Sequence, residues 1–423
     1  MLPTSEPEND LCARSSIAFT YRSSLGYHRA MFTAYTPELM DDLRLRWARI
    51  QEAMRVDGAD ALLVATNVNL FYTSGRVFMG FVYLPVEGTP WFFVRRPVGL
   101  QGDTVINVRK PEQIPELLRD AGVPLPQRIL LESDDLTHSE WLRLSAVFGD
   151  AECADGSALL RRCRAIKTPY EIGIMKKTGS RHAAIIPQYA AVYEPGMTDQ
   201  EWSVEMFHLM LKAGSLGLFR IAGSSMEVFM GTVLAGDNGS AASPYDFALG
   251  GAGLHPSIPI GQSGVRLTDG MAVMVDIAAN FYGYLTDCTR TFSIGPLAPQ
   301  ARDAHQVAIE IQRAIAAAGV PGARCEDLYA LALARAAEAG LADCFMGLSQ
   351  KARFVGHGTG IVINEQPVLG ARSVDTLATG MCIALEPKFV IPGSGAVGVE
   401  DTFLVTPNGM QCITPCDPAI IEL

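Results

Sequence analysis

Two aspartates, Asp276 and Asp287, lie in MAVMVDIAANFYGYLTDCTRT, a stretch that otherwise reads as two buried strands joined by a turn. If the turn is centred on Phe281-Tyr282, Asp276 pairs directly with Asp287. The Cβ atoms of paired residues lie roughly 4.5 to 5.5 Å apart, so the two carboxylates would repel each other. A shared proton or Arg290 would relieve this repulsion, and a divalent metal ion would relieve it more strongly.

A second stretch, MCIALEPKFVIPGSGAVGVEDTFLVT, repeats this arrangement. A turn centred on Gly393, with Pro392 and Gly395 as turn residues, pairs Glu386 with Glu400. The pairing depends on the assumed turn, because a slip of one residue moves a side chain to the other face of the sheet. Two hairpins are therefore expected to present a pair of acidic side chains each.

A histidine lies between the hairpins, in FVGHGTGIVINEQP, where His357 is flanked by Gly356 and Gly358. Glycine on both sides allows the backbone to approach closely in a crowded site. Four carboxylates and one imidazole could hold two divalent ions roughly 3.5 to 4 Å apart. This set suits Mn²⁺, Zn²⁺, Co²⁺ or Fe²⁺, and hardness favours Mn²⁺. Each residue taken singly also has a purely structural explanation, whereas the order Asp, Asp, His, Glu, Glu favours a metal site.

The composition restricts the class of protein. The chain has 423 residues, of which 48% are hydrophobic and 19% charged, so it can form a large core and is expected to make two or more domains. Its net charge of -11 argues against a nucleic-acid partner, which would need clustered lysines and arginines. The sequence predicts neither a membrane span nor a signal peptide, and its cysteines form no CxxC pair, so a cytoplasmic location is expected.

Helical and strand patterns divide the chain into three parts. We predict a polar amino-terminal arm at 1–36, an α/β domain at 37–160 and an α+β domain at 161–423. In the α/β domain a helix is expected to begin after Thr36 and to stop at Gly58, followed by the strands ALLVAT, PWFFVRR and RILLES. The α+β domain contains both acidic hairpins.

The sequence resembles the pita-bread metallopeptidase superfamily, which includes methionine aminopeptidase, aminopeptidase P, prolidase and creatinase. The resemblance lies in VDIAANFYGYLTDCTRTF, GHGTGIVINEQP, ALEP, GVEDTF and the earlier segment AIKTPYEIGIMKK, and covers roughly residues 37–423. It implies a creatinase-like α/β amino-terminal domain followed by an α+β pita-bread catalytic domain. It also implies a homodimer.

The resemblance assigns a role to each of the five residues. Asp287 and Glu400 would bridge two metal ions, Asp276 would complete the coordination of one ion, and His357 and Glu386 that of the other. A metal-bridging water would be the nucleophile, and Glu386 would accept its proton.

Three further residues follow from the same comparison. Thr289 shares the strand face of Asp287 and could donate a hydrogen bond to a metal-bound carboxylate, although strand propensity also explains it. Peptidases of this superfamily usually carry a second histidine where this chain has Asn364, and an amide cannot carry a positive charge or transfer a proton. Another histidine usually precedes the first aspartate, and His255 is the nearest candidate for this substrate-holding role. Asn364 and His255, with Glu386, are therefore the predicted catalytic residues.

Substrate contacts are expected from the glycine-rich stretch FMGTVLAGDNGSAASPYDFALGGAGLHP, which could line a pocket with Tyr245 or Asp246. Arg353, just before the GHG segment, could bind a substrate carboxylate, although a structural ion pair would also explain it.

Three functions are compatible with these residues. The first is a dinuclear metallohydrolase acting on a dipeptide or small amide, similar to an Xaa-Pro dipeptidase or aminopeptidase. The second is a small-molecule enzyme of the same fold, similar to dimethylsulfoniopropionate lyase or ectoine hydrolase, which the replacement at Asn364 favours. The third is a non-catalytic binding protein, which the complete set of five ligands disfavours.

Overall fold

The computed structural model describes residues 36–222, 230–245 and 247–423. The predicted arm at 1–36 lies outside them except for its last residue, and Asp246 also lies outside. Among the described residues, no helix combines the length and the apolar character needed to cross a membrane.

The first part of the chain is built on a mixed sheet with the strand order β4-β3-β2-β1-β5-β6. β1 pairs antiparallel with β2 and parallel with β5, which itself runs parallel to β6. Its strands are β1 (Ala61–Val64), β2 (Met79–Pro85), β3 (Trp91–Arg96), β4 (Val105–Asn107), β5 (Arg128–Leu131) and β6 (Glu152–Asp155). Its helices are α2 (Pro37–Asp57), α3 (Asn67–Ser74), α4 (Ile114–Asp120) and α5 (His138–Ser145). The predicted α/β architecture of this part is confirmed.

Local signals explain the bounds of α2. The Thr36 hydroxyl accepts a hydrogen bond from the N–H of Leu39 at 3.3 Å, and Pro37 occupies the first helical position. Gly58 ends the helix in the left-handed conformation, with a φ of 73°. The helix buries Ile50 against the sheet, and its predicted start and stop are both confirmed.

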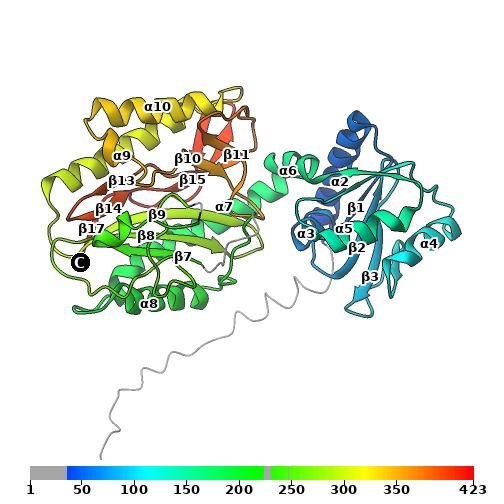
Figure 1. The fold of residues 1–423 in the computed structure, drawn as a ribbon, viewed down its shortest axis with the longest axis horizontal. Coiled ribbons are helices and arrows are strands. Elements are labelled where there is room, and N and C mark those ends of the chain that lie inside the picture. The colour runs from blue at the N-terminus through cyan, green and yellow to red at the C-terminus, as the bar shows by residue number, and fades with distance from the viewer. Residues whose placement is uncertain (1–35, 223–229, 246) are drawn as a thin grey trace, which may run out of the picture.

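The second part contains the remaining strands and four long helices (Figure 1). Its described residues form a sheet β17-β9-β8-β7, a sheet β11-β10-β12-β15-β16 and a pair β13-β14. The strands are β7 (Gly231–Ala235), β8 (Ala272–Asn280), β9 (Leu285–Ser293), β10 (Phe354–Gly358), β11 (Glu365–Gly370), β12 (Cys382–Leu385), β13 (Lys388–Ile391), β14 (Gly395–Gly398), β15 (Asp401–Thr406), β16 (Gly409–Cys412) and β17 (Ile421–Glu422). The helices are α7 (Pro169–Ile185), α8 (Asp199–Lys212), α9 (Pro299–Ala318) and α10 (Cys325–Glu338).

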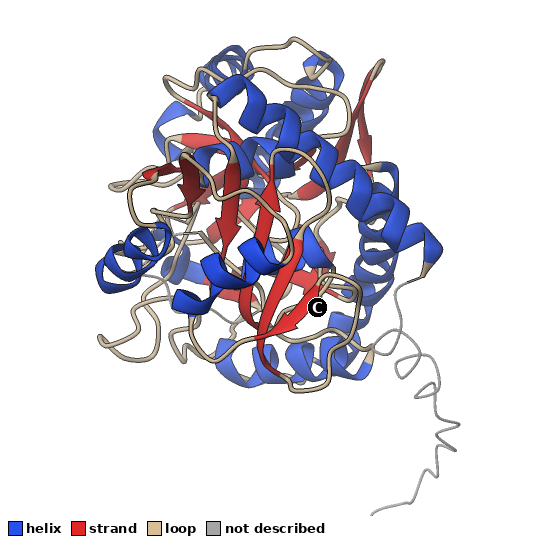
Figure 2. Cartoon of the chain, turned by 90° about the vertical axis from the view of Figure 1, so that its right-hand side faces the viewer, coloured by secondary structure: helices blue, strands red, loops and turns tan. Residues whose placement is uncertain are grey.

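These helices cover the strands from two sides. α9 and α10 contact β13, β14 and β11, whereas α7 and α8 contact the sheet that contains β7, β8 and β9. In Figure 1 these strands lie between α10, at the top, and α8, at the bottom, and in Figure 2 the strands of both parts overlap near the centre of the view with helices around them. The predicted α+β architecture is therefore confirmed, and the inner strands are enclosed on both sides.

Helix α6 (Ser157–Ala165) lies between the two parts in Figure 1. The guanidinium of Arg164, near its end, lies 3.2 Å from Glu365 on β11, and the ammonium of Lys167 lies 2.9 Å from the same carboxylate. The predicted domain boundary between residues 160 and 161 falls inside this helix. Because a helix is a single unit of structure, we propose that the first domain extends to its end.

The first acidic hairpin has a register different from the predicted one. Asn280 pairs with Leu285, so Phe281 to Tyr284 form a four-residue loop in place of a two-residue turn. The side-chain oxygen of Asn280 accepts the N–H of Gly283 at 3.0 Å, and Gly283 has a φ of 82°, which together stabilise the longer loop.

The longer loop alters which residues face each other. Asp276 pairs with Thr289, and Asp287 pairs with Ala278, so the predicted direct pairing of the two aspartates is wrong. The strand partners differ from the prediction by two residues, which preserves the face of every side chain. The aspartates therefore remain on one face as diagonal neighbours.

The second hairpin has the predicted register. Lys388 pairs with Gly398, and Ile391 pairs with Gly395 across the turn at Gly393. Glu386 precedes β13 by two residues and Glu400 follows β14 by two residues, so both acids lie at the open end of this strand pair.

A buried histidine of α7 predicts an acid-sensitive fold. His182 is fully buried, with Nδ1 3.1 Å from the Thr286 hydroxyl, and burial lowers its pKa from 6.5 to about 3. Between these values the unfolded chain binds a proton that the folded chain excludes, so stability falls as the pH falls. From about pH 6.5 to about pH 4.5 we expect the free energy of unfolding to lose about 2 kcal/mol through this residue.

Urea denaturation at both pH values measures the loss. His182→Gln should reduce this loss of unfolding free energy, whereas replacement of the exposed His255 by glutamine should leave the loss unchanged. An equal loss in wild type and His182→Gln would show that other groups cause the acid sensitivity.

Candidate metal centre

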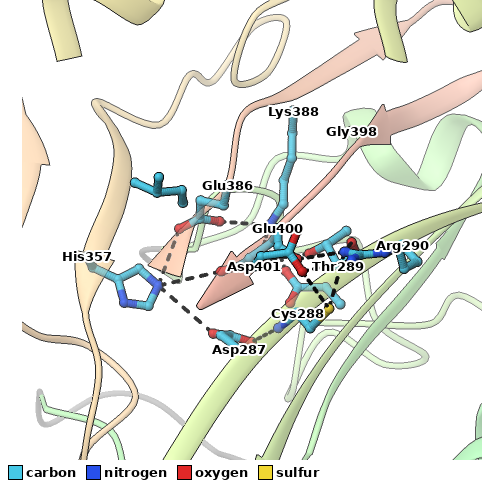
Figure 3. A network of polar contacts seen from close by, with 12 residues as sticks. Asp287, Cys288, Thr289, Arg290, His357, Glu386, Lys388, Gly398, Glu400 and Asp401 are labelled. Carbon is cyan, nitrogen blue, oxygen red and sulfur yellow. Dashed lines mark hydrogen bonds and ion pairs between the residues drawn. The ribbon is translucent and has the colours of Figure 1, made fainter. Parts of the chain in front are cut away.

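The five predicted ligands come together in one buried cluster. Asp276 lies on β8, Asp287 on β9 and His357 on β10, while Glu386 and Glu400 flank the β13-β14 pair. Figure 3 shows the imidazole of His357 directed toward three of the carboxylates, which come from different segments of the chain.

One half of the cluster surrounds the imidazole. The Nε2 atom of His357 lies 3.3 Å from Glu386 Oε1 and 4.0 Å from both Asp287 Oδ2 and Glu400 Oε1. Asp287, His357 and Glu400 each offer one ligand atom within 4.8 Å of the others. Glu400 Oε1 is buried and has no hydrogen-bond partner among the described residues. This half therefore has the donor types and the free oxygen that a divalent ion requires.

The other half contains a lysine. The Nζ atom of Lys388 lies 2.8 Å from Asp276 Oδ2, 2.7 Å from Glu386 Oε2 and 3.1 Å from Glu400 Oε2. Sequence reasoning did not assign Lys388, although it lies in the apolar strand segment ALEPKFVI. It also follows Glu386 by two residues, a spacing that places two side chains on one face of a strand.

Burial and close charges shift the pKa values of these groups. Burial is the main cause that raises the pKa of Asp287 to about 7, and the negative charge of Asp276 is the next. Burial also raises the pKa of Glu400 well above 4.5. Burial opposes ionisation of Glu386 too, but Lys388 and His357 outweigh it and lower its pKa to about 2. Glu386 is therefore ionised at neutral pH.

Thr289 makes the hydrogen bond that its position predicts. Its hydroxyl donates to Glu400 Oε2 at 2.8 Å, and the backbones of the two residues form a bridge. Arg290, the alternative cation considered for the hairpin, instead lies 2.8 Å from Asp401. Figure 3 shows Arg290 near Asp401, away from His357, so Lys388 is the cation that contacts the aspartate of β8.

Thr289→Val removes this hydrogen bond with little change in shape. We expect it to weaken Mn²⁺ binding by about 10- to 100-fold, since such outer contacts hold a ligand in position. Isothermal titration of metal-free protein with MnCl₂ measures the change. If Thr289→Val binds Mn²⁺ as tightly as wild type, the only remaining role of Thr289 is to favour the strand.

A cavity of about 160 Å³ opens onto the cluster. Asp276, Asp287, His357 and Glu386 form its polar floor. Its apolar wall consists of Phe219, Ile221, Met230, Phe247, Ala248, Ala278, Phe354, Ile363 and Val368. A small molecule with an apolar portion could therefore reach the carboxylates.

Asn364 also lines this cavity, but both ends of its amide bind the backbone of Ala222. Its Oδ1 accepts the N–H of Ala222 at 2.7 Å, and its Nδ2 donates to the carbonyl of Ala222 at 3.1 Å. A further bond joins the N–H of Ile363 to the carbonyl of Arg220 at 2.7 Å. The geometry therefore gives Asn364 a positioning role, because it holds the segment that carries Phe219 over the cavity.

The structure does not bring His255 to the cluster. The side chain is exposed, lies 2.8 Å from the Ser257 hydroxyl and is absent from the lining of the cavity. Its predicted contact with substrate finds no support in this geometry.

A larger cavity of about 500 Å³ adjoins the first, and the two share Phe247, Ala248, Phe354 and Val368 in their walls. Tyr245 and Arg353, both predicted to bind substrate, line this second cavity. Neither residue lines the cavity that opens onto the carboxylates, and Asp246 lies outside the described residues.

Sequence comparison identifies the architecture. The model of Metallopeptidase family M24 matches residues 173–407, more than half of the chain, and that of the Creatinase/Prolidase N-terminal domain matches residues 46–166. The chain belongs to metallopeptidase family M24. The predicted pita-bread fold with a creatinase-like amino-terminal domain is thereby confirmed, as is the assignment to a family of hydrolases. The M24 family implies a centre of two divalent metal ions, and the donor set of this chain agrees with it at the His357 half.

Named relatives of this M24 chain include peptidases. It is 27% identical over 377 residues to the uncharacterized peptidase YqhT of Bacillus subtilis, covering 86% of this chain and 96% of the relative. It is 24% identical to an Xaa-Pro dipeptidase of Pyrococcus furiosus, covering 90% of this chain and all of the relative.

Solved structures share the fold of this M24 chain. An Xaa-Pro dipeptidase of Bacillus anthracis superposes with a TM-score of 0.74 at 24% identity, covering 90% of this chain and all of that one. The N-terminal domain of the FACT complex subunit SPT16 from chickpea superposes with a TM-score of 0.66 at 13% identity, covering 89% of this chain and 97% of that one. Proteins with different names thus share this fold, so the substrate must be argued from the site.

Proposed function

We propose that this protein is a metal-dependent hydrolase of Xaa-Pro dipeptides or closely related small amides. The observation that carries the proposal is the convergence of Asp276, Asp287, His357, Glu386 and Glu400 beneath an apolar-walled cavity. Similarity to Xaa-Pro dipeptidases at low identity supports the same substrate class.

The residues divide the chemistry among them. Divalent metal bound by the cluster would lower the pKa of a water molecule and polarise the scissile carbonyl. Glu386 is ionised, faces the cavity and can accept the proton of the attacking water. Thr289 holds Glu400 in place through its hydroxyl. Mn²⁺ is the proposed ion because carboxylate oxygens dominate the donor set.

The substrate would extend from the cluster into the adjoining cavity. Phe219 and Ile221 offer an apolar surface beside the carboxylates, which suits a proline ring. Arg353 in the second cavity would bind the terminal carboxylate of a dipeptide, and Tyr245 lines the same space. The homodimer remains a prediction.

The direct test is hydrolysis of a panel of Xaa-Pro dipeptides by Mn²⁺-loaded protein, compared with non-prolyl dipeptides of equal size. We expect release of free proline from at least one Xaa-Pro substrate. Protein that holds Mn²⁺ but cleaves no member of the panel would overturn the dipeptidase proposal.

The arrangement of Asn364 favours one alternative. Its amide is engaged by Ala222, so no ionisable group at this position is directed at the substrate. We therefore retain a small-molecule enzyme, similar to dimethylsulfoniopropionate lyase or ectoine hydrolase, as the second candidate. Mass spectrometry of a metabolite panel separates the two, because a hydrolase product contains one added water molecule and a lyase product does not.

A further inference from the structure

Lys388 lies at the centre of the carboxylate cluster. It is fully buried, and its ammonium contacts one oxygen each of Asp276, Glu386 and Glu400 at 2.7 to 3.1 Å. An ammonium group has three N–H donors, so each has one carboxylate acceptor. Figure 3 shows the long side chain of Lys388 entering the cluster beside Glu386.

These three carboxylates are also a candidate metal site. Asp276, Glu386 and Glu400 can each direct one oxygen to a common point, with the oxygens within 4.8 Å of one another. Lys388 already contacts two of these carboxylates closely, since Asp276 Oδ2 and Glu386 Oε2 lie within 2.8 Å of its ammonium. A divalent ion and the ammonium would therefore compete for the same acceptors.

At the His357 half, no lysine or arginine of the described residues forms an ion pair with Asp287, and the ion-pair partner of its Oδ2 is the imidazole of His357, itself a candidate ligand. Lys388 contacts Glu400 through Oε2, which leaves Oε1 buried without a hydrogen-bond partner among the described residues. This free oxygen lies 4.0 Å from His357 Nε2, the same distance that separates Nε2 from Asp287 Oδ2. One half of the cluster is thus filled by the ammonium of Lys388, whereas the other keeps a carboxylate oxygen, Glu400 Oε1, without a hydrogen-bond partner among the described residues.

The backbone opposite Lys388 accommodates its stem. Gly398 pairs with Lys388 across the β13-β14 ladder. A Cβ atom at position 398 would lie 2.8 Å from the Cα and 3.1 Å from the Cγ of Lys388, and 2.5 Å from the carbonyl oxygen of Pro387. Any larger residue at 398 would displace the lysine from this path.

Displacing Lys388 would also be costly. An ammonium that leaves these carboxylates inside the protein loses its partners without regaining water, which is strongly unfavourable. An incoming second ion would have to overcome this cost and the repulsion between like charges.

We propose that Lys388 supplies the second cation of this site, so that the chain binds one divalent ion tightly, at the half formed by Asp287, His357 and Glu400. The inference rests on the proposed metal site and departs from the two-ion centre implied by the family. Lys388 neutralises the shared carboxylates Glu386 and Glu400 from one side while the ion binds them from the other.

The test is the number of Mn²⁺ ions bound by the full chain. Wild type and Lys388→Ala are stripped with a chelator, reloaded with MnCl₂, desalted and analysed for metal, and isothermal titration gives the affinities. We expect one equivalent in wild type and two in Lys388→Ala, with the second site at least about tenfold tighter than any second site of wild type. The exposed Lys212→Ala is the control and should retain one equivalent.

Two equivalents in wild type, or one in a folded Lys388→Ala, would overturn the proposal. If Lys388→Ala does not fold, electron paramagnetic resonance of Mn²⁺-loaded wild type decides the question. One isolated ion gives an uncoupled Mn²⁺ spectrum, whereas two carboxylate-bridged ions give an exchange-coupled spectrum, which would contradict the inference.

These outcomes are separate from those of the proposed function. One equivalent without Xaa-Pro hydrolysis would overturn only the substrate assignment. Two equivalents with hydrolysis would overturn only the role of Lys388, and no bound Mn²⁺ would overturn both.

Discussion

Asp287→Asn is expected to lower kcat/KM by at least about 10³-fold and to deplete bound Mn²⁺. Asp287 belongs to the half of the cluster that contains His357 and the free oxygen of Glu400. Asparagine has the same shape but lacks the negative charge that holds a divalent ion. Its Oδ1 can still accept the N–H of Cys288, which lies 3.2 Å from Asp287 Oδ1, so the local backbone should be retained.

Steady-state kinetics and metal analysis on the same preparation check this expectation. Asp303→Asn, on the exposed side of α9, is the matched control and should behave as wild type. If Asp287→Asn kept both its metal and its activity, the proposed centre would be wrong.

Glu386→Gln is expected to lower kcat by about 10²- to 10⁴-fold, the usual contribution of a general base. The carboxylate faces the cavity, and Lys388 and His357 keep it ionised by holding its pKa at about 2. Glutamine cannot accept the proton, but its carbonyl oxygen can still contact a metal ion. The loss should therefore appear in kcat while Mn²⁺ remains bound.

Measuring kcat together with the Mn²⁺ content separates the two roles of Glu386. A parallel loss of metal and activity would make it a ligand only, whereas full activity would exclude it as the base. Glu310→Gln, on the exposed face of α9, controls for the loss of one carboxylate.

Local sequence signals predicted several elements correctly because their causes are local. Thr36 starts α2 and Gly58 ends it, in both cases through contacts with residues only a few positions away. The turn at Gly393 specifies the register of β13 and β14. The register of β8 and β9 was predicted wrongly, because the Asn280 side chain stabilises a longer loop than the sequence suggested.

The candidate metal ligands still lie together in the structure despite that error. A shift of two residues preserves the face of each strand side chain, so Asp287 still lies near His357, and Asp276 near Glu386 and Glu400. Residues outside regular strands had no such constraint. His255 lies in an irregular segment whose path depends on distant packing, and it ends exposed, bonded to Ser257.

The sequence by itself determined the types and order of the candidate ligands and the fold class, because strand periodicity and turn residues place acids on common faces. Only the tertiary structure decided what each polar group contacts. The Asn364 side chain hydrogen-bonds the backbone of Ala222. Lys388, paired with Gly398 across the strands, contacts the carboxylates of one half of the cluster. Such contacts depend on side chains from separate segments packing in three dimensions, and the spacing of residues along one chain does not specify them.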